Sequence, residues 1–479
     1  MKNGWRPSIC NSTFNGMNIL NRTFCLLILV FGLAQACAIY KPLPLNEPTI
    51  GEKLTPPTME SVRLQAKEIR HPILRPLEFD ISNGLSPDEA AILAVLANPK
   101  LRSVRDQRGV AEAQLLQAGI LPNPQLSYSR DFPTAGMTEG AVSAFNFGLN
   151  WEVTSLITRG AKIAAARADA GSVDLDISWQ EWQAAQAAKL QVYHLFFFDQ
   201  QLAVARQEEA GLRENLDLVR RAADQRQMTV LDLAAAEAAL QKMQASVLVT
   251  EQHREQERIA LNQSLGFPAE EAVPLEQTIE PPSLKSLPPV EELASKIEER
   301  RLDLLAFKLG YQSQEERLRA AILGQFPKIG IGFSHAGDAS NVITTGFGIT
   351  IDLPLFDRNQ GTIAVESATR TKLFDEYVGR LFEARGEVAR IVANMASLQR
   401  QSEAAEKALP TLQNVVESYH QALLQRNADV LTYYNARTEL ATKRMELLDL
   451  KRQLAELYVA LEIAAGRYLG QAEKKEANP

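Results

Sequence analysis

The chain contains one pattern twice, about 200 residues apart, and this internal repeat limits its possible folds more than any other feature. The segment Thr229-Val-Leu-Asp-Leu233 has a counterpart in Asp429-Val-Leu-Thr-Tyr433. Likewise, the hydrophobic pattern changes from a helical period to the two-residue period of a strand after Leu121-Pro-Asn-Pro124 and again after Gln325-Phe-Pro327. Each copy reads, in order, as a helix, a β-hairpin, a very long helix, a turn and a return helix. Two copies of one supersecondary unit indicate a duplicated architecture.

Each copy includes two stretches in which apolar and polar residues alternate, which is the pattern of a strand with one apolar face. Phe145 to Val153 and Thr345 to Leu353 are the clearest cases. We expect strands of about 9–10 residues, the length that a tilted transmembrane strand needs. The apolar positions are predicted to form a membrane-facing surface: Leu126, Tyr128, Phe145, Phe147, Leu149, Trp151, Ile329, Ile331, Phe333, Phe347, Ile349 and Ile351.

Long helical segments follow the predicted hairpins. Residues 160–222 contain no proline, and a helix over this segment would extend roughly 95 Å at 1.5 Å per residue. A break at 225–229 leads into a return helix that ends near Leu265, and 425–429 is the equivalent break in the second copy. Two such long helices enclose little interior of their own, so their apolar stripes are expected to meet other copies of the chain.

The N-terminal segment predicts export and lipid attachment. Phe24 to Ala36 is an apolar run of 13 residues, too short for a membrane-spanning helix but typical of a secretory signal peptide. Leu33-Ala-Gln-Ala-Cys37 resembles the bacterial lipobox, in which the cysteine becomes the lipidated N-terminus. No cysteine follows Cys37, so the mature chain has no disulfide framework. The true start is Met1 or Met17.

These signals divide the chain into six segments. We expect a lipoprotein-type signal peptide (1–36), an extended proline-rich arm (37–84), a first repeat (85–265), a proline-rich linker (266–289), a second repeat (290–470) and a C-terminal tail (471–479).

Composition and motifs give no support for an enzyme or a nucleic-acid-binding protein. The net charge is −7, whereas nucleic-acid binding needs a concentrated basic surface. The five histidines show no metal-ligand spacing, and the carboxylates fall at helix-surface spacings. We therefore expect no catalysis, no metal site, no nucleic-acid partner and no cofactor besides the covalent lipid on Cys37.

The sequence resembles the TolC-like outer membrane efflux protein family (the outer membrane factors), and more closely its lipoprotein branch. The resemblance rests on the order and doubling of Ala97-Asn-Pro-Lys-Leu101, Leu121-Pro-Asn-Pro124, the hairpins, Leu353-Pro-Leu-Phe-Asp-Arg-Asn-Gln-Gly361 and Val430-Leu431. It implies an α+β membrane protein that assembles as a homotrimer. Four strands from each chain would form a 12-stranded outer-membrane β-barrel, continued by a long periplasmic α-helical barrel.

The resemblance also implies that the turns after the long helices form a periplasmic tip. Arg226, Gln227, Arg426 and Asn427 would face an adaptor. The family often has a glycine where this chain has Arg226 and Arg426, and Asn427 is expected to take the left-handed turn conformation instead. The family's aspartate of the constriction is replaced by Asn435 and Ala235, which makes an acidic gate doubtful. The residues expected at the gate are Leu231, Asp232, Asp429, Leu431 and Asn435, and the two aspartates fit helix caps equally well.

Together these features predict a lipid-anchored channel of the cell outer membrane that extends into the periplasm. It would be the passive exit duct of a tripartite efflux system. Its partners would be a periplasmic adaptor (membrane fusion protein), an inner-membrane efflux pump of the RND type, and outer-membrane lipid. Two alternatives stay open: the duct of a type I protein secretion system, and a lipid-anchored coiled-coil scaffold with no channel. The sequence does not indicate the cargo.

Overall fold

The computed structural model describes residues 38–136, 139–280, 282, 287–425 and 427–469. The predicted signal peptide, Cys37 and the tail 471–479 lie outside the described residues. The chain divides into two compact units at residue 55. The described part of the first unit contains one short helix, α2 (Glu47–Leu54).

The expectation of an extended arm over 37–84 is wrong, because two short helices form there. α3 (Met59–Lys67) and the single 3-10 turn η1 (Ile81–Asn83) follow α2. Pro48 lies in the first turn of α2, where its missing N–H would have no helical partner in any case. The side chains of Asn46 and Thr58 cap α2 and α3 by accepting backbone N–H groups. The prolines of this region therefore do not exclude helices from it.

The second unit contains the same order of elements twice. The first set is α5 (Pro99–Gly119), β1 (Gln125–Asp131), β2 (Ala144–Glu152), α6 (Ser155–Asp224) and α7 (Val230–Leu265). The second set is α10 (Leu302–Leu323), β3 (Ile329–Gly337), β4 (Ile343–Ile351), α11 (Gln360–Leu424) and α12 (Val430–Ala465). α4 (Pro87–Ala97) precedes the first set, and the short helices α8 (Val290–Ala294) and α9 (Ile297–Arg300) precede the second.

The two return helices show how closely the sets match. α7 and α12 both have 36 residues, and both end on a left-handed glycine, Gly266 with φ 71° and Gly466 with φ 65°. A Cβ atom at Gly266 would lie 2.6 Å from the carbonyl oxygen of Ala97. Position 266 therefore needs glycine both for its backbone conformation and for this close approach.

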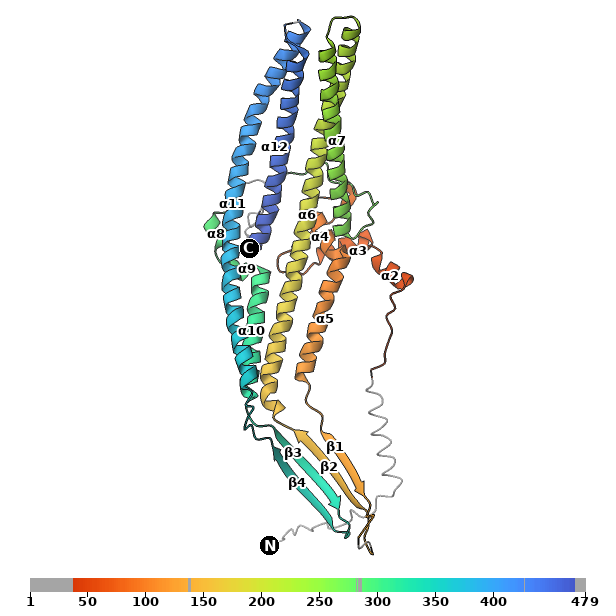
Figure 1. Cartoon of the computed structure of the whole chain (residues 1–479), viewed down its shortest axis with the longest axis vertical. Coiled ribbons are helices and arrows are strands. Elements are labelled where there is room, and N and C mark those ends of the chain that lie inside the picture. Colours follow the sequence, from red (N-terminus) through yellow and green to blue (C-terminus); the bar gives the residue numbers. More distant parts are fainter. Residues whose placement is uncertain (1–37, 137–138, 281, 283–286, 426, 470–479) are drawn as a thin grey trace, which may run out of the picture. The chain divides into compact units, whose positions relative to one another are not determined.

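The four strands form one antiparallel sheet in the order β1-β2-β3-β4. The β2–β3 pairing joins the two sets of elements, and the sheet lies at one end of the long helices of this unit (Figure 1). Three strands have 9 residues as expected, but β1 has only 7. β1 ends before Phe132-Pro133, because proline has no N–H to donate to a sheet.

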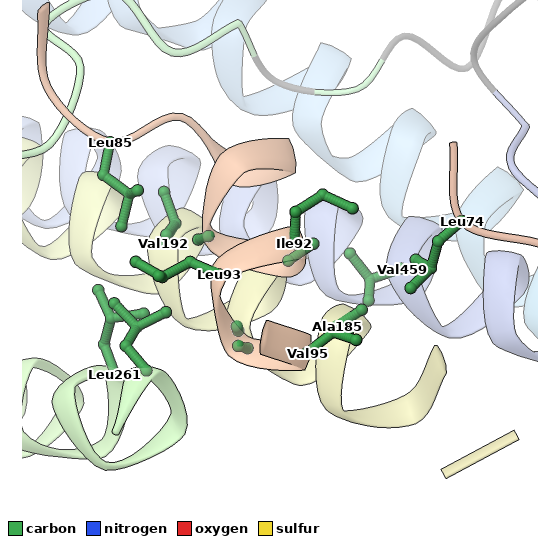
Figure 2. Packing of buried hydrophobic residues seen from close by; sticks show 14 of the residues in the cluster. Leu74, Leu85, Ile92, Leu93, Val95, Ala185, Val192, Leu261 and Val459 are labelled. Atoms are coloured by element: carbon green, nitrogen blue, oxygen red, sulfur yellow. The ribbon is translucent and has the colours of Figure 1, made fainter. Parts of the chain in front are cut away.

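The largest core forms around α4, whose residues are buried on nearly all sides. Ser86 and Glu89 form a capping box at its start, as the sequence pattern predicts. Figure 2 shows Ile92, Leu93 and Val95 of this region packed among side chains from several helices. Among them are Ala185 and Val192 on α6, Leu261 on α7, and Val459 on α12. α4 therefore connects the first repeat, to which it belongs, with residues of the second repeat.

A buried charged cluster lies beside this core. Lys189 on α6 has its Nζ atom 3.2 Å from an oxygen of Glu462 on α12 and 3.1 Å from an oxygen of Asp88 on α4. Burial by itself lowers the pKa of Lys189, but the two carboxylates outweigh burial and raise that pKa above its ordinary value. Glu462 also accepts the backbone N–H of Leu469. The sequence pattern predicts that the carboxylates lie on helix surfaces, and this prediction is wrong for Glu462. Its carboxylate is buried, and the ion pair with Lys189 compensates the free-energy cost of burying the charge.

Within the described residues, no helix is both long enough and apolar enough to cross a membrane.

Candidate functional site

One face of the sheet carries all twelve residues predicted to face the membrane. The antiparallel register pairs Tyr128 with Phe147, Leu149 with Phe333, and Ile331 with Ile349. Directly paired residues point to the same face of a sheet. The other predicted positions follow by the two-residue period: Leu126, Phe145, Trp151, Ile329, Phe347 and Ile351.

Much of this apolar face is left exposed by the residues that the structure describes. Phe347 is 88% exposed and Ile349 71% exposed, although large apolar side chains are usually buried in a soluble domain. The opposite face carries small or polar residues, among them Ser127, Asn146, Gly348 and Thr350. Contact between the apolar face and lipid stays a prediction, whereas the separation of the two faces is a property of the register.

The sheet has two open edges. β1 pairs only with β2, and β4 pairs only with β3, among the strands of the described segments. An open edge presents unpaired backbone N–H and C=O groups, which need partners in any apolar environment. The edges are therefore places where further strands would add.

The second candidate region is the tip, formed by the loops that join α6 to α7 and α11 to α12. Leu231 is 81% exposed and Leu431 54% exposed. Neither predicted gate leucine is therefore buried within a single chain. Asn435 is exposed as well.

Both predicted tip aspartates are helix caps. Asp232 accepts the backbone N–H of Thr229 at 2.8 Å, while Thr229 Oγ1 accepts that of Asp232 at 3.1 Å. Asp429 accepts the backbone N–H of Thr432 at 2.7 Å. This hydrogen bond, together with the Thr432 hydroxyl, lowers the pKa of the Asp429 carboxyl. The caps fix where the return helices start.

The left-handed residue of the first tip loop is Arg226, with φ 58°. Its N–H donates to the carbonyl of Ala223, and the N–H of Gln227 donates to that of Ala222, at 2.9 and 2.8 Å. These two bonds form the Schellman motif that ends many helices, usually with glycine at the left-handed position.

The expected left-handed conformation of Asn427 is wrong. Asn427 has no positive φ, and its N–H donates to the carbonyl of Ala422 at 2.8 Å. It therefore occupies the position of Gln227 in the motif, one residue after the left-handed one. Arg426 lies outside the described residues.

We expect the change Arg226→Gly to stabilise the tip. A side chain in the left-handed region costs about 1–2 kcal/mol, which glycine avoids. The melting temperature of the purified protein should rise in Arg226→Gly and not in Arg226→Ala, which removes the guanidinium but keeps the Cβ atom. An equal gain in both variants would contradict a backbone origin.

A polar cluster near the tip was missed by the sequence analysis. Glu208 on α6 is only 7% exposed, yet it accepts hydrogen bonds from Arg437 Nε at 2.9 Å and Arg444 Nη1 at 3.2 Å, both on α12. The hydroxyl of Tyr433 lies 3.3 Å from Arg437 Nη1 and 3.4 Å from Asn215 Nδ2. These contacts join the helices of the first repeat to the return helix of the second. In the sequence, the only sign of these contacts is a charged residue within the apolar stripe of a helix.

A cavity of about 200 Å³ lies beside this cluster, between α6, α7 and α12. Its lining includes Glu208, Lys242, Met243, Thr438 and Met445. No group of three or more histidine, cysteine or acidic side chains in the described part of the chain is arranged to hold a metal ion.

Comparison with known proteins agrees with this geometry. A model of the outer membrane efflux protein family matches residues 293–467, which run from α8 to the end of α12. This part of the chain is therefore similar to outer membrane efflux protein domains. The resemblance inferred from the sequence motifs is thereby confirmed, while membership of the lipoprotein branch stays a prediction.

Similar proteins extend the match beyond this domain. The Cation efflux system protein CusC of Escherichia coli (strain K12) is 27% identical over 285 residues, which cover 55% of this chain and 62% of the relative. The match therefore spans less than two thirds of that relative's length.

Solved structures share the fold. A crystal structure of CusC has a TM-score of 0.68 at 18% identity and covers 83% of this chain and 98% of that chain. The CmeC outer membrane channel of Campylobacter jejuni has a TM-score of 0.68 at 14% identity and covers 91% and 96%. The α+β fold predicted for the chain is confirmed by these similarities.

Proposed function

We propose that this chain is the outer-membrane subunit of an efflux duct, a passive conduit that catalyses no reaction. The observation that carries the proposal is the four-stranded sheet with one exposed apolar face and two open edges. Four strands are too few to close a barrel, since the smallest known have about eight. Three copies would supply twelve strands, the number that the family resemblance implies.

The long helices support a periplasmic extension of the same duct. α6 has 70 residues and α11 has 65, and a helix of 70 residues extends about 105 Å. The tip would then lie far from the membrane, where an adaptor and an inner-membrane pump of the RND type would meet it. Arg226, Gln227 and Asn427 are exposed there, as an adaptor-facing surface requires.

The relatives favour efflux over protein secretion as the function of this chain. CusC is named as part of a cation efflux system, and we propose small solutes rather than proteins as the cargo of this chain. A protein-secretion duct is the alternative with the same fold, and the conductance experiment below separates a channel from a scaffold without one.

The decisive experiment for the proposed function is conductance in planar lipid bilayers. The purified protein should form channels, and the variant Leu231→Ser with Leu431→Ser should show a larger resting conductance, because both leucines are exposed at the tip and available to close the mouth against other copies. The same variant should admit bulky antibiotics to cells. Absence of any conductance would support the scaffold, and an unchanged conductance in the variant would exclude these leucines from the gate.

Lipid attachment at Cys37 is part of the proposal. Each buried methylene of an acyl chain contributes about 0.8 kcal/mol to membrane binding, and the barrel would hold the protein in the membrane as well. We expect the intact mass of the mature protein to equal the chain from Cys37 plus acyl groups. Cys37→Ala should lose the lipid label and still form channels. A mature N-terminus at another residue would exclude this anchor.

A further inference from the structure

A buried histidine lies in the irregular segment 68–80, between α3 and η1. Only 2% of the His71 side chain is exposed, and a buried ring needs hydrogen-bond partners for both of its nitrogen atoms. Its Nε2 atom lies 2.9 Å from the backbone carbonyl oxygen of Ser178 on α6. Its Nδ1 atom accepts the backbone N–H groups of Ile73 at 3.0 Å and Leu74 at 2.9 Å. The ring therefore joins the backbone of the segment to the backbone of α6.

These partners determine which ring nitrogen carries the proton. A carbonyl oxygen only accepts, so Nε2 carries the hydrogen and donates it to Ser178. Backbone N–H groups only donate, so Nδ1 is unprotonated and offers its lone pair to Ile73 and Leu74. A second proton, on Nδ1, would face these two donors without any acceptor. Both N–H groups would also lose their acceptor, which is unfavourable in a buried place.

The charged groups around the ring come from α5 and α6. A carboxylate oxygen of Glu181 on α6 lies 3.8 Å from Nε2, and Glu181 is held at 2.6 Å by Arg105 on α5. Next to this pair, Arg108 on α5 binds Asp174 on α6 at 2.6 Å. The carboxylate nearest to the ring is therefore already paired with a guanidinium.

We propose that His71 is an acid-sensitive latch, which fastens the segment 68–80 to α6 and releases it when the ring binds a second proton. Residues 69–80 form no helix or strand, so their attachment to the helices depends on individual contacts. Leu74, beside the latch, is 3% exposed and belongs to the core around α4. Release would therefore loosen the edge of that core.

The position of the segment in the chain gives the latch a consequence. It lies between Cys37, the predicted site of lipid attachment, and α4. In a lipid-anchored chain, release would add free length between the anchor and the long helices. The latch itself goes beyond the proposed duct and does not depend on it.

The direction of the pH effect follows from the pKa of the ring. Burial is the largest influence and lowers the pKa of His71 below its ordinary value of 6.5. The hydrogen bond to Ser178 and the charge of Glu181 act to raise this pKa, Arg105 acts to lower it, and the net shift is downward. The folded protein thus binds this proton less readily than the unfolded chain. The stabilisation is fully present above the ordinary value and is lost as the pH falls below it.

Hydrogen exchange of backbone amides tests the latch. The full-length protein in detergent is compared at pH 7.5 and pH 5.0, with each exchange rate corrected by that of the same peptide in the unfolded chain. Peptides that cover residues 69–77 should lose protection several-fold at pH 5.0, while peptides from α7 keep theirs. Unchanged protection of 69–77 at pH 5.0 would overturn the proposal.

The variant His71→Asn removes the titration and keeps the acceptor. The Oδ1 atom of asparagine takes a place close to that of Nδ1, accepts backbone N–H groups two residues on, and binds no proton in this range. Protection of 69–77 should therefore be the same at both pH values. The matched control His420→Asn changes a half-buried histidine on α11 that packs against Tyr433, and it should keep the wild-type loss. A wild-type loss in His71→Asn would show that another group titrates and would contradict the latch.

A second variant distinguishes titration of the ring from general loosening. The charge of Glu181 acts to raise the pKa of His71, so Glu181→Gln should lower that pKa further, and protection of 69–77 should be lost only at a lower pH than in the wild type. If Glu181 were itself the titrating group, the loss would disappear. If the variant only weakened packing, protection would fall at both pH values. Either result would contradict the proposal.

Discussion

Replacement of Lys189 by methionine should strongly destabilise the helical region of the protein. Lys189→Met leaves the buried carboxylate of Glu462 without its ammonium partner. Breaking one half of a buried ion pair typically costs about 3–5 kcal/mol, because the remaining charge has lost both water and partner. We expect loss of helical circular dichroism at a clearly lower urea concentration than in the wild type.

The double variant Lys189→Met with Glu462→Leu should recover most of the loss, because an apolar pair needs no compensation. Lys443→Met is the matched control, since Lys443 pairs with Glu446 on the more exposed side of α12 and such pairs contribute roughly 0–1 kcal/mol. If the double variant is no more stable than Lys189→Met alone, the loss arises from packing rather than from the unpaired charge.

This loss should be larger at pH 9 than at pH 6, because burial raises the pKa of the Glu462 carboxyl and removal of Lys189 raises it further, so that the variant can relieve the unpaired charge by binding a proton at the lower pH. The carboxylates raise the pKa of Lys189 in the folded protein above the ordinary value of 10.5. A raised pKa gives stability that is fully present below the unfolded value and is lost only as the pH rises through the folded value. The Lys189 ammonium of the wild type therefore stays charged at both pH values, and the difference between them arises from Glu462 in the variant.

A positive charge on the apolar face of the sheet should prevent assembly in the membrane. Phe147→Arg and Ile349→Arg each place an arginine among residues that the register assigns to one face. At the middle of a membrane this costs about 2–4 kcal/mol for each copy, and therefore about 6–12 kcal/mol for three copies. We expect loss of the heat-modifiable trimer on gels and less protein in the outer-membrane fraction.

The control for this prediction is Asn146→Arg, on the neighbouring residue of the same strand. Asn146 points to the opposite face, paired with Ser129 and Ala336, where a charge would meet water. This variant should assemble normally. Equal damage in all three variants would contradict this assignment of the two faces.

Local patterns in the sequence predict much of this fold because their physical causes are local. The two-residue period of a strand sets its faces whatever the strand pairs with, so the twelve apolar positions could be named in advance. Ser86 with Glu89, Thr229 and Asp429 cap helices through bonds that span three residues. Local patterns also have a limit: the prolines of 37–84 predict an extended arm, although Pro48 lies in the first turn of a helix.

The sequence by itself determined the duplicated order of elements, the strand faces, the helix ends and the family resemblance. Only the tertiary structure decided which helices share partners: Lys189 with Glu462, Glu208 with Arg437, and His194 with Glu456. Each of these pairs is separated by more than 200 residues. A charged residue on a helix has the same sequence pattern whether it meets water or a distant partner. Helical periodicity shows on which side of the helix a residue lies, but it does not show what packs against that side. The partner appears only when α12 packs against α6.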